Sequence, residues 1–270
     1  MSRKDRFAAG TRTALVTGAS KGIGRCYALQ LAREGYNVVM VAVDEDELVR
    51  TASEVRAANP QVQVRWLSKD LATPTAGEEL FAWVKAEGIE TDVLINNAGI
   101  FSFCDILNTP IERISRIIML HDLTATVTCR LFAADMAARG WGRILNMSSY
   151  SIWMPYPGLS LYSASKAYLK SFSVAFSKEV RELGVTVTAV CPAGIATDLY
   201  GLAPRWQKIG LRLGVLMSPE SCARRSLRAM WRGRRCIVPD WWFRLLIPFC
   251  RMVSGPVMRW LRNFTMPFQK

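Results

Sequence analysis

Short apolar runs alternate with longer helical stretches along most of the chain, and this alternation constrains the fold more than any other feature. Apolar runs separated by helices are typical of strands that are buried on both faces, so they predict a parallel sheet. The fold class that we expect is α/β, with a single doubly wound domain of about seven strands. The predicted strands are Thr13–Thr17, Asn37–Val43, Val62–Leu67, Asp92–Ile95, Arg143–Met147, Val185–Val190 and a short Cys236–Pro239.

Helices are expected between these strands. One ends near Gly35, one begins at Glu45, and one lies around Glu78–Glu87. Two longer helices are predicted over Pro110–Arg139 and Ser160–Leu183. No apolar stretch of about eighteen residues runs without a charge, so the sequence predicts no helix that spans a bilayer.

The distribution of charge separates a balanced body from a basic tail. Residues 1–202 carry 21 Lys+Arg and 20 Asp+Glu, a net charge of +1. Residues 203–270 carry 14 Lys+Arg and 2 Asp+Glu, a net charge of +12. We therefore expect two regions with different roles, a folded domain over residues 1–239 and a basic, aromatic extension over residues 240–270.

The seven cysteines are scattered, and no two of them form a CxxC pair. His121 is the single histidine, so the sequence predicts no zinc-type cluster and no metal site. The charged N-terminal segment MSRKDRFAAGTR lacks the apolar core of a secretory signal. Reduced thiols and the missing signal indicate a cytoplasmic protein, with peripheral attachment to a membrane surface as the alternative.

A glycine-rich turn, TGASKGIG, joins the first strand to the helix that follows it. Gly18, Gly22 and Gly24 permit a tight turn and a close approach of the backbone to a phosphate, and the helix N-terminus offers free N–H groups. The turn therefore predicts a pyrophosphate site, although glycines after a strand can also serve to make a turn alone. The NNAG segment, Asn96–Gly99, closes the fourth strand, where a doubly wound sheet places its ligand crevice.

Tyr162 and Lys166, in the segment YSASK, lie four residues apart and so share one face of a predicted helix. Ser149 lies thirteen residues before Tyr162, at the end of the fifth strand. A lysine ammonium near a phenol favours the phenolate and lowers the pKa of the tyrosine towards neutrality. Tyr162 and Lys166 are therefore predicted to carry general acid–base catalysis, although in isolation a tyrosine and a lysine on one face of an ordinary amphipathic helix would be the better explanation.

Taken together, these motifs resemble the short-chain dehydrogenase/reductase family, which includes hydroxysteroid dehydrogenases and 3-ketoacyl reductases, from about Arg12 to Pro239. The resemblance implies a Rossmann-type fold, NAD(H) or NADP(H), and hydride transfer between nicotinamide and a carbonyl or alcohol. By that likeness Tyr162 gives or takes the proton, Ser149 binds the substrate oxygen, and Lys166 holds the nicotinamide ribose. The residues implied in cofactor binding are Gly18, Ser20, Lys21, Gly22, Ile23, Gly24, Asp44, Asp70, Leu71, Asn97, Ala98, Gly99, Tyr162, Lys166, Pro192, Ile195 and Thr197.

One position departs from the family pattern. Asp122 aligns best with the family's catalytic asparagine, whose backbone carbonyl holds a water that relays protons to the lysine. A backbone role survives a change of side chain, so Asp122 is included among the catalytic candidates. Its carboxylate could instead pair with Lys166 or order the helix. His121, next to it, is interpreted as structural rather than as a proton relay.

The second strand bears on the choice of cofactor. Family members that use NAD usually carry an acid at the position of Ala42, and those that use NADP often carry arginine at the position of Val43. Neither signature is present. Lys21 could meet a 2′-phosphate, whereas Asp44 could bind a ribose or cap the following helix. Because Lys21 is present and position 42 carries no acid, NADP(H) is favoured over NAD(H).

The segments that follow Ser149 and the sixth strand are apolar. Tyr150, Trp153, Met154 and Tyr156 follow the serine, and CPAGIATDLYGL resembles the family's PGxxxT segment. Such a pocket favours a bulky hydrophobic small molecule, a sterol or an acyl chain, although packing residues have the same composition. The resemblance also implies that the two long helices pair between subunits, so a homodimer or homotetramer is expected.

The extension Asp240–Lys270 interleaves basic residues with tryptophan and phenylalanine and is interrupted by three prolines. This pattern is typical of peripheral contact with an anionic membrane, or the segment packs on the body or on a partner subunit. No nucleic-acid recognition fold is visible, so no nucleic acid partner is expected. The predicted function is carbonyl–alcohol interconversion on a hydrophobic substrate. A non-catalytic cofactor-binding sensor or membrane scaffold on the same fold is the alternative.

Overall fold

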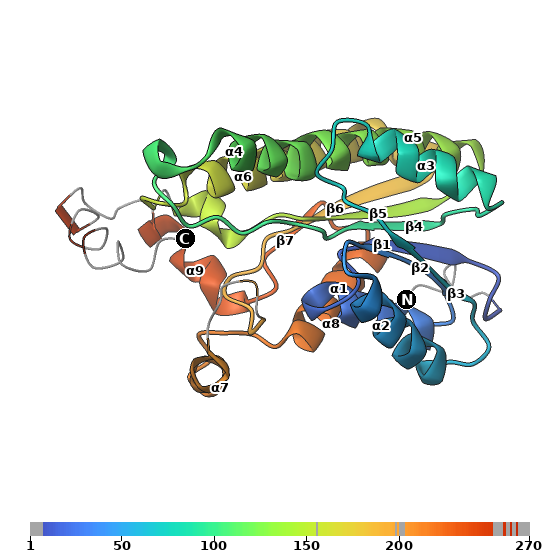
Figure 1. Cartoon of the computed structure of the whole chain (residues 1–270), viewed down its shortest axis with the longest axis horizontal. Helices are drawn as coiled ribbons and strands as arrows, with labels where there is room; N and C mark the ends of the chain where they lie inside the picture. Colours follow the sequence, from blue (N-terminus) through green and yellow to red (C-terminus); the bar gives the residue numbers. More distant parts are fainter. Residues whose placement is uncertain are drawn as a thin grey trace.

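Seven parallel strands form one sheet in the order β3-β2-β1-β4-β5-β6-β7 (Figure 1). The computed structural model describes residues 8–154, 156–197, 199 and 203–250, together with residues 256, 257, 260 and 263. The strands are β1 (Thr13–Thr17), β2 (Asn37–Ala42), β3 (Val64–Ser68), β4 (Val93–Asn96), β5 (Gly142–Met147), β6 (Val185–Val190) and β7 (Cys236–Ile237). The predicted α/β doubly wound fold is confirmed, and the strand bounds differ from the predicted ones by at most two residues.

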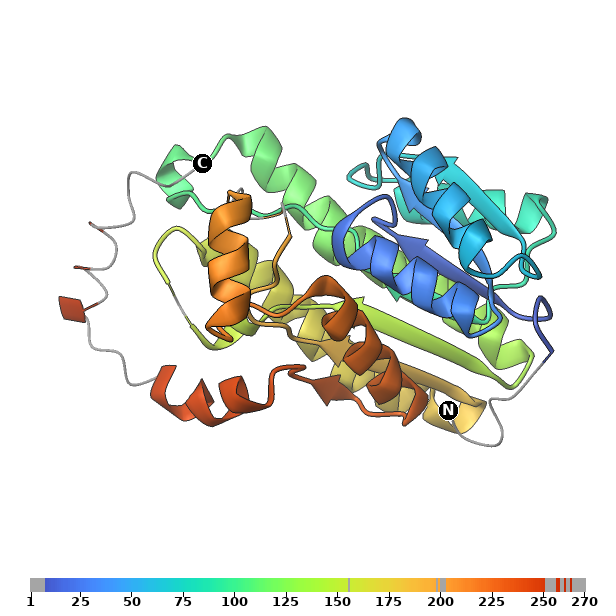
Figure 2. The same cartoon turned by 90° about the horizontal axis from the view of Figure 1, so that it is seen from below.

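Helices cover both faces of the sheet, as Figure 1 shows. One layer consists of α1 (Gly22–Arg33), α2 (Glu45–Ala58) and α8 (Pro219–Trp231). The other consists of α3 (Ala76–Ala86), α4 (Ile111–Ile118), α5 (Ala125–Ala138) and α6 (Ser160–Glu179). Two further helices, α7 (Pro204–Arg212) and α9 (Trp241–Cys250), lie beyond the layer of α1, α2 and α8, at the end of the molecule where the strands finish (Figure 2).

The alternation of side chains along each strand builds two cores, one on each face of the sheet. Val16, Val38 and Met40 face the layer of α1, α2 and α8. Leu15, Val39 and Val41 face the layer of α3, α5 and α6. Because both faces are covered, the strands are apolar throughout, which is why they stand out in the sequence.

The strand order reverses at β1, which pairs with β2 on one side and with β4 on the other. The chain leaves β1 and β4 towards opposite faces, so a crevice opens at their carboxyl ends. The glycine turn follows β1 and the segment Asn97–Gly99 follows β4, so both line this crevice. The topology thereby brings together motifs that are about 80 residues apart in the chain.

The predicted single helix over Pro110–Arg139 is wrong in one respect. The segment divides into α4, a π-helical turn at Met119–Thr124, and α5. A π turn inserts an extra residue into the helical ladder, and such turns often occur at functional sites. Here it turns the His121 side chain into the interior, where 1% of the residue is exposed.

Ile111–Ala138 is the one stretch among the described residues that is long and apolar enough to cross a membrane by length and composition. Phe132, Ala133 and Met136 of this stretch belong to the core beneath the sheet. The stretch therefore packs as a core helix in this structure. The N-terminal residues 1–7 and most of residues 251–270, on which part of the tail prediction falls, lie outside the described residues.

Candidate active site

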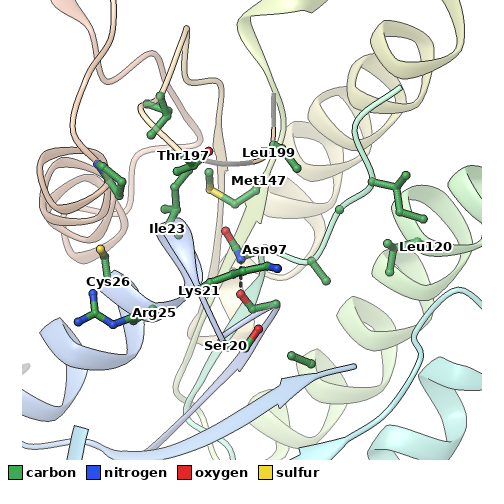
Figure 3. Close-up of a pocket in the computed structure, with 18 of the residues that line it drawn as sticks. Ser20, Lys21, Ile23, Arg25, Cys26, Asn97, Leu120, Met147, Thr197 and Leu199 are labelled. Carbon is green, nitrogen blue, oxygen red and sulfur yellow. Dashed lines mark hydrogen bonds between the residues drawn. The ribbon is translucent and has the colours of Figure 1, made fainter. Parts of the chain in front are cut away.

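A cavity of about 770 Å³ occupies the crevice at the carboxyl ends of β1, β4 and β5. Its walls come from the glycine turn, the ends of β2 and β3, the NNAG segment, the end of β5, α6 and the segment after β6. Figure 3 shows Arg25 on one side of this cavity, Leu120 on the opposite side, and Lys21 between them, beside Asn97. A cleft of this size at a topological switch point is suited to a dinucleotide and a small substrate.

The glycine turn adopts a conformation that side chains would oppose. Gly18 and Gly22 have φ of +64° and +58°, in the left-handed region that favours glycine. A Cβ atom on Gly24 would lie 1.9 Å from the carbonyl oxygen of Gly18, so this position must be glycine for the turn to close. The turn leads into the N-terminus of α1, which points its free N–H groups at the cavity.

Hydrogen bonds from the NNAG segment fix this turn. The Thr17 hydroxyl accepts the backbone N–H groups of Asn97 and Ala98, each at 3.0 Å. The Asn97 side-chain amide donates to the carbonyl oxygens of Thr17 at 3.0 Å and Gly18 at 3.2 Å. The backbone of the glycine turn is therefore held in place by the protein itself.

The predicted catalytic residues Ser149, Tyr162 and Lys166 are brought together at one end of the cavity, and all three are buried. Tyr162 and Ser149 share a hydrogen bond. The Lys166 ammonium donates to the carbonyl oxygen of Met147 at 2.9 Å and lies 5.8 Å from the centre of the Tyr162 ring. The neighbouring Ser148 hydroxyl donates to the Lys166 carbonyl oxygen at 2.7 Å, which leaves Ser149 as the serine that meets the tyrosine.

The electrostatics of Tyr162 differ from the expectation. Burial raises the pKa of Tyr162 to about 12, and the hydrogen bond with Ser149 acts in the opposite direction. The predicted phenol near neutrality is therefore not produced by these protein groups, because desolvation of the phenolate outweighs them. At neutral pH Tyr162 is a protonated phenol, which suits a proton donor.

Asp122 lies in the π turn and acts electrostatically on Lys166. Burial lowers the pKa of Lys166 to about 8, and the Asp122 carboxylate opposes this shift. Burial raises the pKa of Asp122 to about 6, and Lys166 opposes that shift. Asp122 is not among the residues that line the cavity, so it acts on Lys166 rather than on a ligand directly.

His121 forms a chain of hydrogen bonds that fixes its neutral form. The Ile100 backbone N–H donates to Nε2 at 2.9 Å, so Nδ1 carries the proton and donates to the Ser165 hydroxyl at 2.9 Å. The Ser165 hydroxyl in turn donates to the Tyr162 carbonyl oxygen at 2.9 Å. Burial and then the charge of Lys166 lower the pKa of His121 well below its usual value. These contacts agree with the structural interpretation of this histidine.

Most residues that the sequence implied in cofactor binding line the cavity. They are Gly18, Ser20, Lys21, Gly22, Ile23, Asp44, Asp70, Leu71, Asn97, Ala98, Gly99, Tyr162, Lys166, Pro192, Ile195 and Thr197. Gly24 does not line it but makes room for the turn. Asp44 both lines the cavity and caps α2, because its carboxylate accepts the Glu47 N–H at 3.0 Å.

Two groups of residues differ from the sequence reading. Arg25 on α1 and Lys69 after β3 also line the cavity, although the sequence analysis did not predict them. Arg25 follows the glycine turn and Lys69 follows the end of a strand, and these two positions could have indicated them. The aromatic residues Tyr150 and Trp153 do not line the cavity and pack against each other in a small core. Their composition could not distinguish packing from a pocket wall. Part of the segment between the sixth strand and α7, at residues 198 and 200–202, lies outside the described residues.

The sheet order and the position of this cavity together define a domain of Rossmann type, with its cleft at the topological switch point. Residues 12–208 match the family described as short chain dehydrogenase, and the chain belongs to that family.

Relatives and solved structures share this architecture. The chain is 36% identical over 179 residues to a very-long-chain 3-oxoacyl-CoA reductase of Pyricularia oryzae. The aligned residues make up 66% of this chain and 54% of that protein. It is similar to a bulky-bulky ketone specific alcohol dehydrogenase of Comamonas testosteroni, with a TM-score of 0.75 and 28% identity over 88% of this chain and 91% of that one. The chain is also similar to a short-chain dehydrogenase of Sphingobium yanoikuyae in complex with NADPH. The TM-score is 0.76 and the identity is 29%, over 87% of this chain and 92% of that one. The chain thus spans about half the length of the Pyricularia relative.

The buried Lys166 ammonium yields a prediction about stability. Because the pKa of Lys166 falls from 10.5 in the unfolded chain to about 8 in the folded one, the unfolded state binds more protons between these values. The free energy of unfolding therefore rises with pH across this window, and below it the buried charge costs on the order of 3 kcal/mol. Lys166→Met should raise the free energy of unfolding at pH 7 by about 1–3 kcal/mol, as urea denaturation would measure.

The gain in Lys166→Met should shrink as the pH rises above about 8 and disappear above 10.5, where the lysine is neutral in both the folded and the unfolded chain. Lys178→Met is the matched control on the same helix, because its exposed ammonium is hydrated in both states. A loss of stability in Lys166→Met at pH 7 would contradict the argument that desolvation dominates at this residue.

Proposed function

We propose that this protein is an NAD(P)-dependent oxidoreductase that interconverts a carbonyl and an alcohol on a hydrophobic substrate. The observation that carries the proposal is the buried cluster of Ser149, Tyr162 and Lys166 beside the glycine turn, within one cavity. A sensor or scaffold without catalysis would have no use for a proton donor buried at the end of the cofactor cleft.

The cleft fits a nicotinamide dinucleotide. Gly18, Gly22 and the N-terminus of α1 form a cradle that a side chain would fill, which suits a pyrophosphate. Thr197, whose methyl group would lie 3.5 Å from a Cβ on Gly22, belongs to the nicotinamide end of the proposed site. When bound, the nicotinamide supplies or accepts the hydride.

Tyr162 and Ser149 act on the substrate oxygen in this proposal. The Ser149 hydroxyl orients the carbonyl oxygen, and the Tyr162 phenol donates its proton to that oxygen as the carbonyl carbon is reduced. The pKa of Tyr162, raised to about 12 by burial, keeps the phenol protonated and so favours reduction. The tyrosine then regains a proton from solvent by way of the Lys166 ammonium, whose pKa of about 8 permits exchange near neutrality.

The substrate class that we propose is a bulky apolar ketone or acyl compound. Ile100, Leu120, Met147, Ile195 and Leu199 line the cavity, and an apolar wall favours an acyl chain or a steroid over a sugar. The names of the Pyricularia and Comamonas proteins, a very-long-chain 3-oxoacyl-CoA reductase and a bulky-bulky ketone dehydrogenase, support this class.

Replacing Tyr162 with phenylalanine tests the reaction. The variant loses the proton donor and should lose turnover on a hydrophobic ketone by about 10²–10⁴-fold, followed by nicotinamide absorbance. Tyr168→Phe removes a hydroxyl from the exposed face of the same helix and should leave turnover unchanged. Binding of NADPH should persist in both variants, and near-normal turnover of Tyr162→Phe would refute the role of this residue.

NADP(H) is the cofactor that we propose, in preference to NAD(H). Lys21 and Arg25 line the same cavity as the end of β2, so their positive charges are available to a 2′-phosphate. Arg25 also donates from Nε to the Glu54 carboxylate at 2.7 Å. Ala42 ends β2 without an acid that would repel a 2′-phosphate. The NADPH complex of the Sphingobium protein supports this preference.

Lys21→Gln tests the choice of cofactor. Loss of one charge-assisted hydrogen bond, worth about 1.5–3 kcal/mol, should weaken NADPH binding by about tenfold or more. The dissociation constant for NADH should change little, because NADH has no 2′-phosphate. Fluorescence titration of the two cofactors measures the difference, and an equal loss for both would show that Lys21 serves the shared pyrophosphate.

A homodimer or homotetramer through the layer of α4, α5 and α6 is the assembly that we propose. Ile118 and Tyr168 expose 44% of their surface on these helices, so this layer presents apolar side chains to solvent. We expect an oligomer in light scattering at micromolar concentration, and we expect Ile118→Asp to shift it towards the monomer. Leu183→Asp, on a half-exposed leucine outside these helices, is the control.

The proposed location is cytoplasmic, with peripheral contact at a membrane surface. All seven cysteines are free thiols, which suits a reducing compartment.

A further inference from the structure

Helix α9 leaves an apolar stripe exposed. Trp241, Leu245 and Phe249 are spaced four residues apart and so share one face, and each exposes between 64% and 67% of its surface. Such large apolar side chains rarely stay together in water on a soluble surface unless something covers them. Val257 and Trp260, two of the described residues that follow α9 in the chain, are also exposed.

The opposite face of α9 is fixed to the active-site end of the body. Phe243 and Ile247 pack against the small core that contains Tyr150, and the Tyr150 hydroxyl donates to the Phe243 carbonyl oxygen at 2.8 Å. Tyr150 directly follows the proposed catalytic Ser149, and its backbone N–H donates to the Pro192 carbonyl oxygen at 2.8 Å. The exposed stripe is therefore attached to the same segment that forms the end of the cavity.

Helix α7 presents cations beside a second group of exposed apolar side chains. Arg205, Lys208 and Arg212 recur at helical spacing on one exposed face, and none of the ion pairs among the described residues includes them. Trp206 and Ile209 on the same helix are 54% and 43% exposed. Gln207 of α7 lines the cavity, so this helix also borders the active site.

We propose that the stripe of α9 and the cationic face of α7 dock on an anionic lipid bilayer, so that hydrophobic substrate enters the cavity from the membrane. The charge of the region argues for this occupant. Helices α7 and α9 carry four basic residues, Arg205, Lys208, Arg212 and Arg244, and no acidic residue, a charge that an anionic surface attracts and a second copy of the same face repels. Tryptophan beside arginine and lysine suits the headgroup level, where rings lie in the interface and cations reach phosphates.

Docking here differs from the oligomer interface proposed above. Figure 1 places α7 and α9 below the sheet, at the end of the molecule where the strands finish, whereas α4, α5 and α6 lie above the sheet. An oligomer formed through that layer can leave the docking face free. The delivery of substrate rests on the proposed function, whereas lipid binding does not.

Co-sedimentation of the full chain with vesicles tests the docking. We expect binding to phosphatidylcholine vesicles that contain phosphatidylserine, weaker binding at high salt, and much weaker binding to pure phosphatidylcholine. Replacing Arg205, Lys208 and Arg212 together with glutamine should lower the partition constant by about a hundredfold. Replacing Trp241, Leu245 and Phe249 together with serine should abolish sedimentation.

Matched variants lie outside α7 and α9. Lys178→Gln combined with Arg181→Gln removes two exposed cations, and Leu183→Ser removes a leucine that is 53% exposed. Leu183 lies just before the start of β6, at the end of the sheet remote from the cavity. These variants should sediment as the wild type does. Circular dichroism and NADPH binding check that every variant is folded.

Several outcomes would overturn the docking. They are no sedimentation of the wild type at low salt, equal binding to neutral vesicles, and equal loss in the control variants. A serine-substituted stripe that changes the oligomeric state and leaves lipid binding intact would assign α9 to a contact between copies of the chain.

Kinetics separate delivery from the reaction itself. With a long-chain ketone dissolved in the vesicles, the α7 and α9 variants should raise KM with little change in kcat. With a short water-soluble ketone, KM should equal that of the wild type. An unchanged KM on the vesicle substrate would refute delivery while the reaction stands. Tyr162→Phe should lose turnover and still sediment with vesicles as the wild type does. The test of the reaction and the test of lipid docking can therefore fail independently of each other.

Discussion

The hydrogen bonds between Thr17 and the segment after β4 are the constraint on which the site depends. The Thr17 hydroxyl, at the end of β1, accepts the N–H groups of Asn97 and Ala98 and donates to the Ile95 carbonyl oxygen at 3.3 Å, so it ties the end of β1 to the end of β4. Gly18 packs so closely on Ala98 that a Cβ would lie 2.9 Å from its Cα. The glycine turn therefore has a fixed position relative to β4, and through the β4–β5 pairing it has a fixed position relative to Ser149.

Desolvation governs the chemistry that this framework allows. Tyr162, Lys166 and His121 are all buried, and burial is the largest cause of each pKa shift. The neutral forms of the phenol and the imidazole are favoured, while the carboxylate of Asp122 helps Lys166 to stay charged. A side-chain oxygen of Asp122 is buried without a hydrogen-bond partner. Its carboxylate is thus suited to act through charge, which differs from the backbone role that the family pattern implies for the aligned asparagine.

The sequence predicted the sheet well because strands buried on both faces leave an unambiguous apolar run. The bounds of β1 and β6 agree with the predicted ones, and the motifs after β1, β4 and β5 met at one cavity as their topology required. The π turn at Met119–Thr124 could not be predicted, since one shifted hydrogen bond leaves no trace in composition. The packing of Tyr150 on Phe243 depends on residues 93 apart, so an aromatic run after Ser149 resembled a pocket wall.

The boundary in charge at residue 203 is not a boundary in the fold. Helix α8 and strand β7 lie within the basic region, yet Leu227 and Met230 of α8 are in the core and β7 completes the sheet. The excess of cations therefore belongs to the outer surface of elements whose inner faces are structural. Because parallel strands bring all loops that follow them to one edge, the cofactor cradle after β1 and the basic, aromatic helices after β6 and β7 share that edge. A sheet of this topology can thus receive a phosphorylated cofactor at its centre and an apolar substrate from its β6–β7 side.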